Sequence, residues 1–306
     1  MVIEHLFPAF ALIVLGAFLK RFHMTDRAFL ARTDRLIYYI FFPGMLFWKI
    51  GTADRHLAGE AFDLYLATMC AIGAVYVLST VYIVFWVPKF QAGAFSQSCY
   101  RFNTYVGMAV VLSILGERGV ALFGILIAVA IPLINVLAVT TLIWFSEHPG
   151  NWRQRLRSTF FSIVSNPLVI SCAAGLLYAR WINAFPSFID STFRLGAAVT
   201  LPLALISIGG SLTLQTLKTY FRPALASAAF KLLLLPATGA LFLHMFGVAG
   251  IYYAVGLIFF ALPTSPAIYV LSSQLGSDTE LASAAIMLST VLSFCSLTVV
   301  IGLLHA

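Results

Sequence analysis

Two stretches of the sequence, Phe102-Asn103-Thr104-Tyr105-Val106-Gly107 and Leu262-Pro263-Thr264-Ser265-Pro266-Ala267, interrupt otherwise apolar segments. The two prolines remove backbone hydrogen bonds and clash with the preceding helical turn. Asn103 and Thr104 carry side chains that compete for backbone bonds, and Gly107 weakens a helix. Lipid cannot satisfy an exposed backbone group, so each such group costs several kcal/mol unless protein or water pairs with it. The sequence therefore predicts two broken membrane helices, with the break around Pro263 and Pro266 the more strongly specified.

The composition is that of a membrane protein. Of 306 residues, 61% are hydrophobic and only 9% are charged, and the mean hydropathy is +0.98. A soluble domain carries about 25% charged residues. The net charge of +7 lies mainly in short loops between apolar spans, a pattern that reports orientation in a lipid bilayer rather than a nucleic-acid partner. The four cysteines show no metal-ligand or disulfide spacing, and no metal site is expected.

Ten spans of membrane-crossing length are expected. They cover residues 3–20, 34–50, 61–87, 95–115, 119–144, 160–180, 191–214, 222–246, 250–275 and 280–304. Counted over the loops, eleven Lys and Arg residues lie on one side and five on the other. The positive-inside rule then predicts a multi-pass inner (plasma) membrane protein with both termini on the extracytoplasmic side.

The two breaks belong to an internal repeat, because Gly107 and Pro266 are 159 residues apart and this offset recurs. The matches at the same offset include Pro8 with Pro167, Pro43 with Pro202, and Val111-Leu112-Ser113 with Val270-Leu271-Ser272. We therefore expect one membrane domain built from repeats at residues 1–150 and 151–306. Five helices per repeat is an odd number, so the second copy enters the membrane inverted.

Broken helices at corresponding places in an inverted repeat are typical of a transport site. If both helices unwind and cross, half-helix N-termini present positive partial charge near the bilayer midplane, which suits a small anion.

Specific motifs resemble those of the auxin efflux carrier family. They are Arg101-Phe102-Asn103-Thr104-Tyr105-Val106-Gly107, Leu115-Gly116-Glu117-Arg118-Gly119, Ile131-Pro132-Leu133-Ile134-Asn135-Val136, Asn166-Pro167-Leu168, and Leu201-Pro202 with Ile208-Gly209-Gly210-Ser211-Leu212. The resemblance extends over the whole chain. Many members place a proline shortly after the glycine of helix four, whereas this chain continues Gly107-Met108-Ala109-Val110, which predicts a looser crossover there.

The resemblance implies an all-α fold of ten transmembrane helices in two inverted five-helix repeats. Helices 1, 2, 6 and 7 would form a scaffold, helices 3–5 and 8–10 a transport part, and helices 4 and 9 would be broken and crossing. It further implies a secondary transporter, not an enzyme, that moves a small organic anion by alternating access. Bacterial members are associated with carboxylates such as malonate or malate, and plant relatives export auxin. A homodimer through the scaffold helices is one expectation for its assembly.

The candidate substrate-binding residues gather at the two breaks. They are Arg101, Asn103, Thr104, Tyr105, Gly107, Asn135, Pro263, Thr264, Ser265 and Pro266, with Lys231 and Gln274 as candidates for ion coupling. The Asn103 amide can donate to a carboxylate or cap a half helix. Arg101 can clamp a carboxylate or extend to the lipid headgroups. Asn135 is expected first to join helices and second to contact substrate.

Two rival hypotheses stay open on the sequence. A sodium-coupled symporter of a larger amphipathic organic anion would need several oxygen ligands around the breaks, and coupling to Na⁺ or H⁺ is expected without any other cofactor. A membrane-embedded sensor or enzyme is the second rival. The chain contains no His-Glu metal motif, Gly-x-Ser-x-Gly elbow, phosphate loop or pair of intramembrane carboxylates that would support catalysis.

Overall fold

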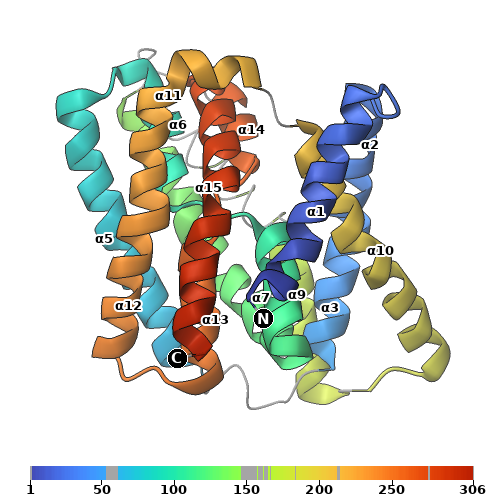
Figure 1. The fold of residues 1–306 in the computed structure, drawn as a ribbon. Helices are drawn as coiled ribbons and strands as arrows, with labels where there is room; N and C mark the ends of the chain where they lie inside the picture. Colours follow the sequence, from blue (N-terminus) through green and yellow to red (C-terminus); the bar gives the residue numbers. More distant parts are fainter. Residues whose placement is uncertain are drawn as a thin grey trace. The chain divides into compact units, whose positions relative to one another are not determined.

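The computed structural model describes residues 2–52, 61–145, 157, 161, 165, 167–182, 184–211, 214–274 and 276–305. Within these ranges the chain is predominantly helical and contains no strand (Figure 1). Five of the described helical stretches are long and apolar enough to cross a membrane. The all-α membrane fold expected from the sequence is confirmed.

Contacts divide the chain into two compact units. Unit 1 comprises Met1–Phe62, Tyr105–Val129 and Val164–Leu212, and unit 2 comprises Asp63–Thr104, Ala130–Ile163 and Thr213–Ala306. Each unit thus takes segments from both halves of the sequence. The sequence analysis placed all of the fourth and fifth spans in the transport part, whereas residues 105–129 group with unit 1. The repeats at 1–150 and 151–306 stay a prediction.

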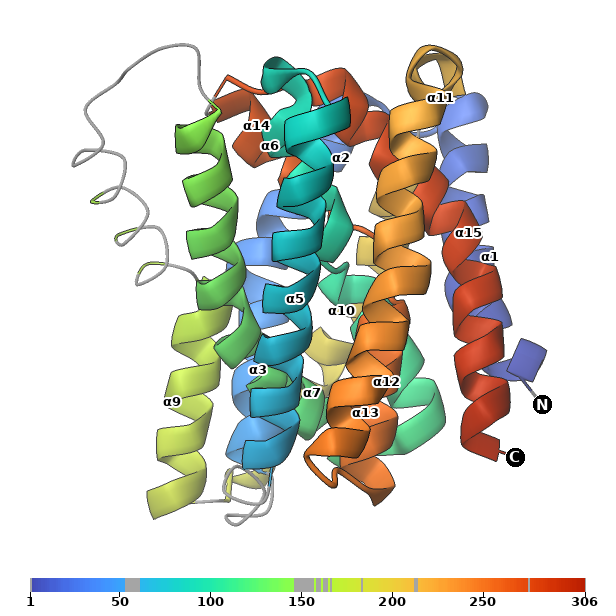
Figure 2. The ribbon, with the colours of Figure 1, turned by 90° about the vertical axis from the view of Figure 1, so that its left-hand side faces the viewer.

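Unit 1 is a bundle of paired helices. Its elements are α1 (Val2–Arg21), α2 (Arg27–Leu36), the π-helical segment η1 (Ile37–Phe41), α3 (Phe42–Gly51), α9 (Pro167–Trp181) and α10 (Ser187–Ser211). Helix α1 lies against α10 (Figure 1), and α3 lies against α9 (Figure 2). Pro43 opens α3 directly after η1, where a proline needs no backbone donor.

The close helix pairs in unit 1 are made possible by glycines, and one contact occurs twice at the repeat offset. A Cβ atom on Gly16 of α1 would overlap the backbone of Ile206 in α10. A Cβ on Gly175 of α9 would lie 3.1 Å from the carbonyl oxygen of Phe47 in α3. Gly175 lies 159 residues after Gly16, and Ile206 lies 159 residues after Phe47, so the two contacts correspond under the repeat. Small residues let membrane helices approach closely, and this repeated contact supports the predicted repeat.

Unit 2 contains the other helices. They are α5 (Phe62–Trp86), α6 (Lys89–Tyr100), α11 (Leu214–Ala229), the π-helical segment η2 (Phe230–Leu234), α12 (Leu235–Met245), α13 (Gly250–Ala261), α14 (Ala267–Gln274) and α15 (Thr279–His305). Helices α11 and α15 pack side by side (Figure 2). The long helix α7 (Thr104–Trp144) starts in unit 2, runs through unit 1 to Val129, and returns to unit 2. Gly116 turns its chain with a φ of 64°.

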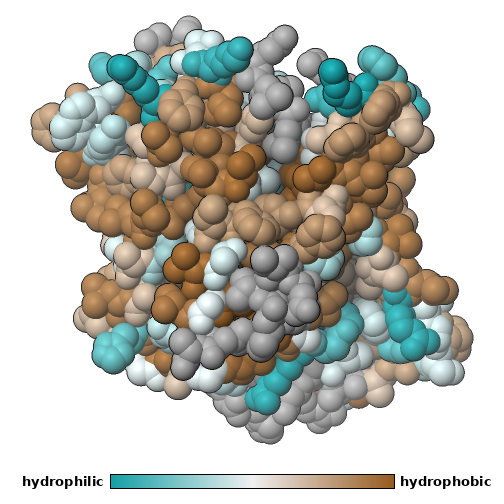
Figure 3. Space-filling model, in the orientation of Figure 1, coloured by the Kyte–Doolittle hydropathy of each residue, from teal (hydrophilic) through white to brown (hydrophobic). Residues whose placement is uncertain are grey.

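Large apolar side chains cover much of the exposed surface. Phe85, Trp86, Leu195 and Leu303 are each more than 60% exposed. Figure 3 shows apolar side chains over much of one face, with hydrophilic side chains gathered mainly near its upper and lower edges. A water-soluble monomer rarely exposes so much contiguous apolar surface. These side chains are suited to contact with lipid.

Candidate functional site

Both predicted helix breaks are present, and they meet inside unit 2. Residues 101–103 separate α6 from α7, and residues 262–266 separate α13 from α14. The backbone N–H of Asn103 donates to the carbonyl of Pro263 at 2.8 Å. The Thr264 hydroxyl donates to the carbonyl of Ser98 at 3.0 Å, near the end of α6. Each break therefore supplies partners for backbone groups that the other break releases.

The break in the fourth span is as clear as that in the ninth, but it lies earlier than expected. The non-helical residues are 101–103, and α7 is already helical at Thr104. Gly107 is buried within regular helix and does not form part of the break. The irregular chain ends at Asn103 because its backbone N–H pairs with Pro263 instead of continuing α6. The expectation of an interruption extending to Gly107 was wrong.

Two half-helix N-termini open at the breaks, one at Thr104 of α7 and one at Ala267 of α14. Ser265 caps α14, because its hydroxyl oxygen accepts from the backbone N–H of Ala267 at 3.2 Å. Asn103 is fully buried beside the start of α7. The positive end of the helix dipole at each start favours an anion.

Arg101 and Asn135 interact directly. The Arg101 guanidinium donates to the side-chain oxygen of Asn135, and Arg101 is buried rather than extended to the lipid headgroups. Asn135 lies half-buried in the part of α7 that belongs to unit 2. The contact joins the end of α6 to α7, the helix-joining role expected first for Asn135. It also holds a positive charge beside the first break.

Lys231 lies fully buried in η2. Its ammonium donates to the carbonyl of Phe260 at 3.1 Å. The next carbonyl, that of Ala261, accepts from the Ser296 hydroxyl at 2.9 Å. Both carbonyls stand at the C-terminus of α13, where a broken helix leaves acceptors unpaired and where the dipole favours a cation. Lys231 therefore places an amine donor at the second break.

The other candidate residues have more peripheral places. Thr104 is the half-buried first residue of α7. Tyr105 packs its ring edge-on against Phe42 within unit 1, with the centroids 5.0 Å apart. Pro266 forms the turn before α14, where its carbonyl accepts from Tyr269 at 3.1 Å. Gln274 ends α14, and its side chain lies outside what the structure describes.

Serines of α15 complete the site, and the sequence analysis missed them. The hydroxyl of Ser289 accepts from the backbone N–H of Thr264 at 3.1 Å, and Ser296 caps α13 as described above. Ser289, Ser293 and Ser296 share one helix face at spacings of four and three. A polar stripe in the apolar tenth span was the signal that could have located them. Over the described residues, no group of three or more His, Cys, Asp or Glu side chains could hold a metal ion.

Comparison with known proteins agrees with this architecture. Residues 1–301 match the family model described as membrane transport protein. The chain belongs to this family of membrane transport proteins. The match confirms the resemblance to auxin efflux carriers that the motifs indicated.

Two archaeal proteins are similar to this transporter over nearly their full length. An uncharacterized transporter of Methanothermobacter thermautotrophicus is 24% identical over 306 residues, covering 96% of this chain and 95% of the relative. An uncharacterized transporter of Methanocaldococcus jannaschii is 21% identical over 290 residues, covering 92% of each chain. The protein is thus a multi-pass membrane transporter.

Proposed function

We propose that this transporter moves a small organic anion, a mono- or dicarboxylate, by alternating access, with the anion bound where residues 101–104 and 262–266 meet. The observation that carries the proposal is the hydrogen bond between Asn103 and Pro263. It joins the two breaks within one unit, and a half helix begins after each of them, at Thr104 and at Ala267. Binding at unwound half-helices is a recurrent design in secondary transporters.

Charge supports an anion over a cation. Arg101 and Lys231 are both buried in unit 2, one beside each break. The Arg101 guanidinium adds its charge to the positive partial charge of the two half-helix N-termini, and Lys231 adds a hydrogen-bond donor. A carboxylate entering this region would gain charge-assisted hydrogen bonds. The Asn103 side-chain amide is the group we expect to donate to it.

The proposal is tested by uptake and counterflow of radiolabelled mono- and dicarboxylates in proteoliposomes. We expect transport that is lost in Asn103→Ala and in Asn103→Asp, since the aspartate adds a repelling charge at nearly constant volume. A thermal-stability screen of the same variants separates loss of folding from loss of binding. Full transport in both variants would remove Asn103 from the site.

Coupling is tested by comparing uptake under sodium and proton gradients. We propose that no sodium is needed, because the Lys231 side chain already donates to a carbonyl at the C-terminus of α13 that a sodium ion would otherwise use as a ligand. The sodium-coupled alternative requires uptake of an amphipathic anion that rises with external sodium.

We also propose that the protein resides in the inner (plasma) membrane with both termini on the extracytoplasmic side. The excess of Lys and Arg in the opposite loops supports this orientation. Fusion of a periplasm-dependent reporter enzyme to the C-terminus tests this orientation. An inactive fusion would indicate that the C-terminus lies on the cytoplasmic side.

A further inference from the structure

A pocket of about 210 Å³ lies within unit 1, and its lining includes none of the residues assigned to substrate above. Its wall comes from three helices: Met45, Trp48 and Lys49 of α3; Met108, Leu112, Glu117 and Val120 of α7; and Arg194, Ala197, Ala198 and Leu201 of α10. Sites for drug-sized ligands occupy about 300–1,000 Å³. The size of this pocket fits a small molecule.

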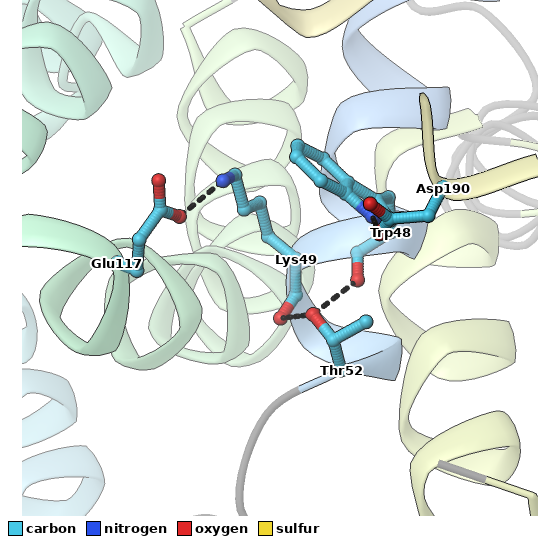
Figure 4. Close-up of polar contacts among 5 residues, drawn as sticks. All are labelled: Trp48, Lys49, Thr52, Glu117 and Asp190. Atoms are coloured by element: carbon cyan, nitrogen blue, oxygen red, sulfur yellow. Dashed lines mark hydrogen bonds and ion pairs between the residues drawn. The ribbon is translucent and has the colours of Figure 1, made fainter. Parts of the chain in front are cut away.

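Three charged side chains line an otherwise mainly apolar wall. Lys49 and Arg194 are positive, and Glu117 is negative. Lys49 forms an ion pair with Glu117, as Figure 4 shows. Arg194 makes a 3.4 Å hydrogen bond to the hydroxyl of Ser191, one turn earlier in α10. The lining therefore has two positive side chains and one negative side chain, that of Glu117, which leaves a net charge of +1.

The two members of the ion pair differ in their exposure. The Lys49 side chain is 13% exposed, whereas that of Glu117 is 65% exposed. Water can solvate Glu117 readily if it leaves, but Lys49 is held in a low-dielectric wall where an anionic partner is worth more. Glu117 also follows Gly116, whose φ of 64° marks a turn rather than continuous helix. Another anion can therefore replace the Glu117 carboxylate, while the Lys49 ammonium stays in the pocket wall.

Lys49 is positioned from its own helix. Its ammonium lies 3.9 Å from the centre of the Trp48 ring, a cation–π contact. The Trp48 indole N–H donates to the Asp190 carboxylate of α10 at 2.8 Å, so the ring is fixed (Figure 4). Asp190 keeps its negative charge while it accepts this bond, and it belongs to the support of the pocket. Trp48 also provides an optical probe at the pocket wall.

We propose that this pocket is a second anion-binding site, in which a small carboxylate displaces Glu117 from Lys49 and pairs with Lys49 and Arg194. The apolar side chains Met108, Leu112 and Val120 would contact the carbon skeleton. Glu117 acts as a resident competitor that occupies Lys49 while the site is empty. Binding here involves only unit 1 and does not require that the two breaks in unit 2 bind substrate.

The test measures binding of malonate to the purified full-length protein by quenching of Trp48 fluorescence. Potassium chloride at equal ionic strength is the control, and Trp48→Phe defines the signal from the other tryptophans. We expect Glu117→Gln to lower the Kd about two- to fivefold, since an exposed ion pair limits the gain to about that factor. Lys49→Met should raise the Kd at least about tenfold, while Lys49→Arg keeps binding.

Matched variants in unit 2 guard against general effects of charge. Glu280→Gln removes a carboxylate and Arg222→Gln removes a positive charge elsewhere in the protein, and both should leave the Trp48 signal unchanged. Repeating the titration in Asn103→Ala separates the two sites, because a signal that persists there belongs to unit 1 even if transport is lost. An unchanged Kd in both Glu117→Gln and Lys49→Met, or no quenching beyond chloride, would overturn the proposal. The ion pair would then serve only to tie α3 to α7.

Discussion

The hydrogen bond from Thr264 to Ser98 offers a direct test of how the two breaks hold each other. Thr264→Val removes the hydroxyl but keeps the shape of a side chain that is 1% exposed. The Ser98 carbonyl then loses the hydroxyl that joins it to the second break, at the point where α6 is ending.

The expected size of the effect follows from two magnitudes. A buried acceptor left unpaired costs about 1–3 kcal/mol, whereas single interhelical bonds in membrane proteins average about 0.6 kcal/mol. We therefore expect a loss of about 1 kcal/mol. This corresponds to a change of about fivefold in the equilibrium between the joined and the separated state of the two breaks. Carboxylate uptake at limiting substrate should fall about fivefold, and the unfolding midpoint in denaturant should fall with it.

Thr200→Val is the matched control. Thr200 is fully buried in α10, and its hydroxyl donates to the Gly196 carbonyl of its own helix at 2.8 Å. That carbonyl keeps its regular helical donor when the hydroxyl is lost, so we expect a change of about 0.5 kcal/mol or less and normal uptake. Equal effects of Thr264→Val and Thr200→Val on stability and uptake would refute the reasoning.

Substitutions at four further positions probe other parts of the structure. Lys231→Met should abolish or strongly reduce carboxylate uptake while Lys231→Arg retains part of it; uptake unaffected by the loss of charge would assign the lysine a packing role. Gly16→Ala should destabilise the protein by about 1–3 kcal/mol through overpacking of α1 against α10. Gly73 has open space around it, so Gly73→Ala should stabilise α5 by up to about 1 kcal/mol. Denaturant unfolding should show changes in the free energy of unfolding of opposite sign for the two variants. Gly116→Ala should cost about 1–3 kcal/mol, because a φ of 64° with a ψ of −157° is a backbone conformation that essentially only glycine adopts. An unchanged midpoint would mean that the turn can relax.

The membrane class and the two breaks could be read from the sequence because both depend on local chemistry. Long apolar runs must cross lipid, and Pro263 and Pro266 interrupt a helix wherever they occur. The exact limits of the break in the fourth span depended on a partner. Asn103 leaves the helix where the Pro263 carbonyl accepts its N–H, and nothing near Asn103 in the sequence reveals that bond.

The sequence by itself determined the elements of this protein: apolar helices, two interruptions at one repeat offset, and the positively charged residues beside them. Only the tertiary structure decided which groups meet. In it, Lys231 is buried against the end of α13, Arg101 donates to Asn135, and Glu117 forms an ion pair with Lys49. The physical reason is that hydrophobicity and helix breaking act over a few neighbouring residues. The pairing of buried polar groups joins residues far apart in the sequence, such as Ser98 and Thr264, which are 166 positions apart.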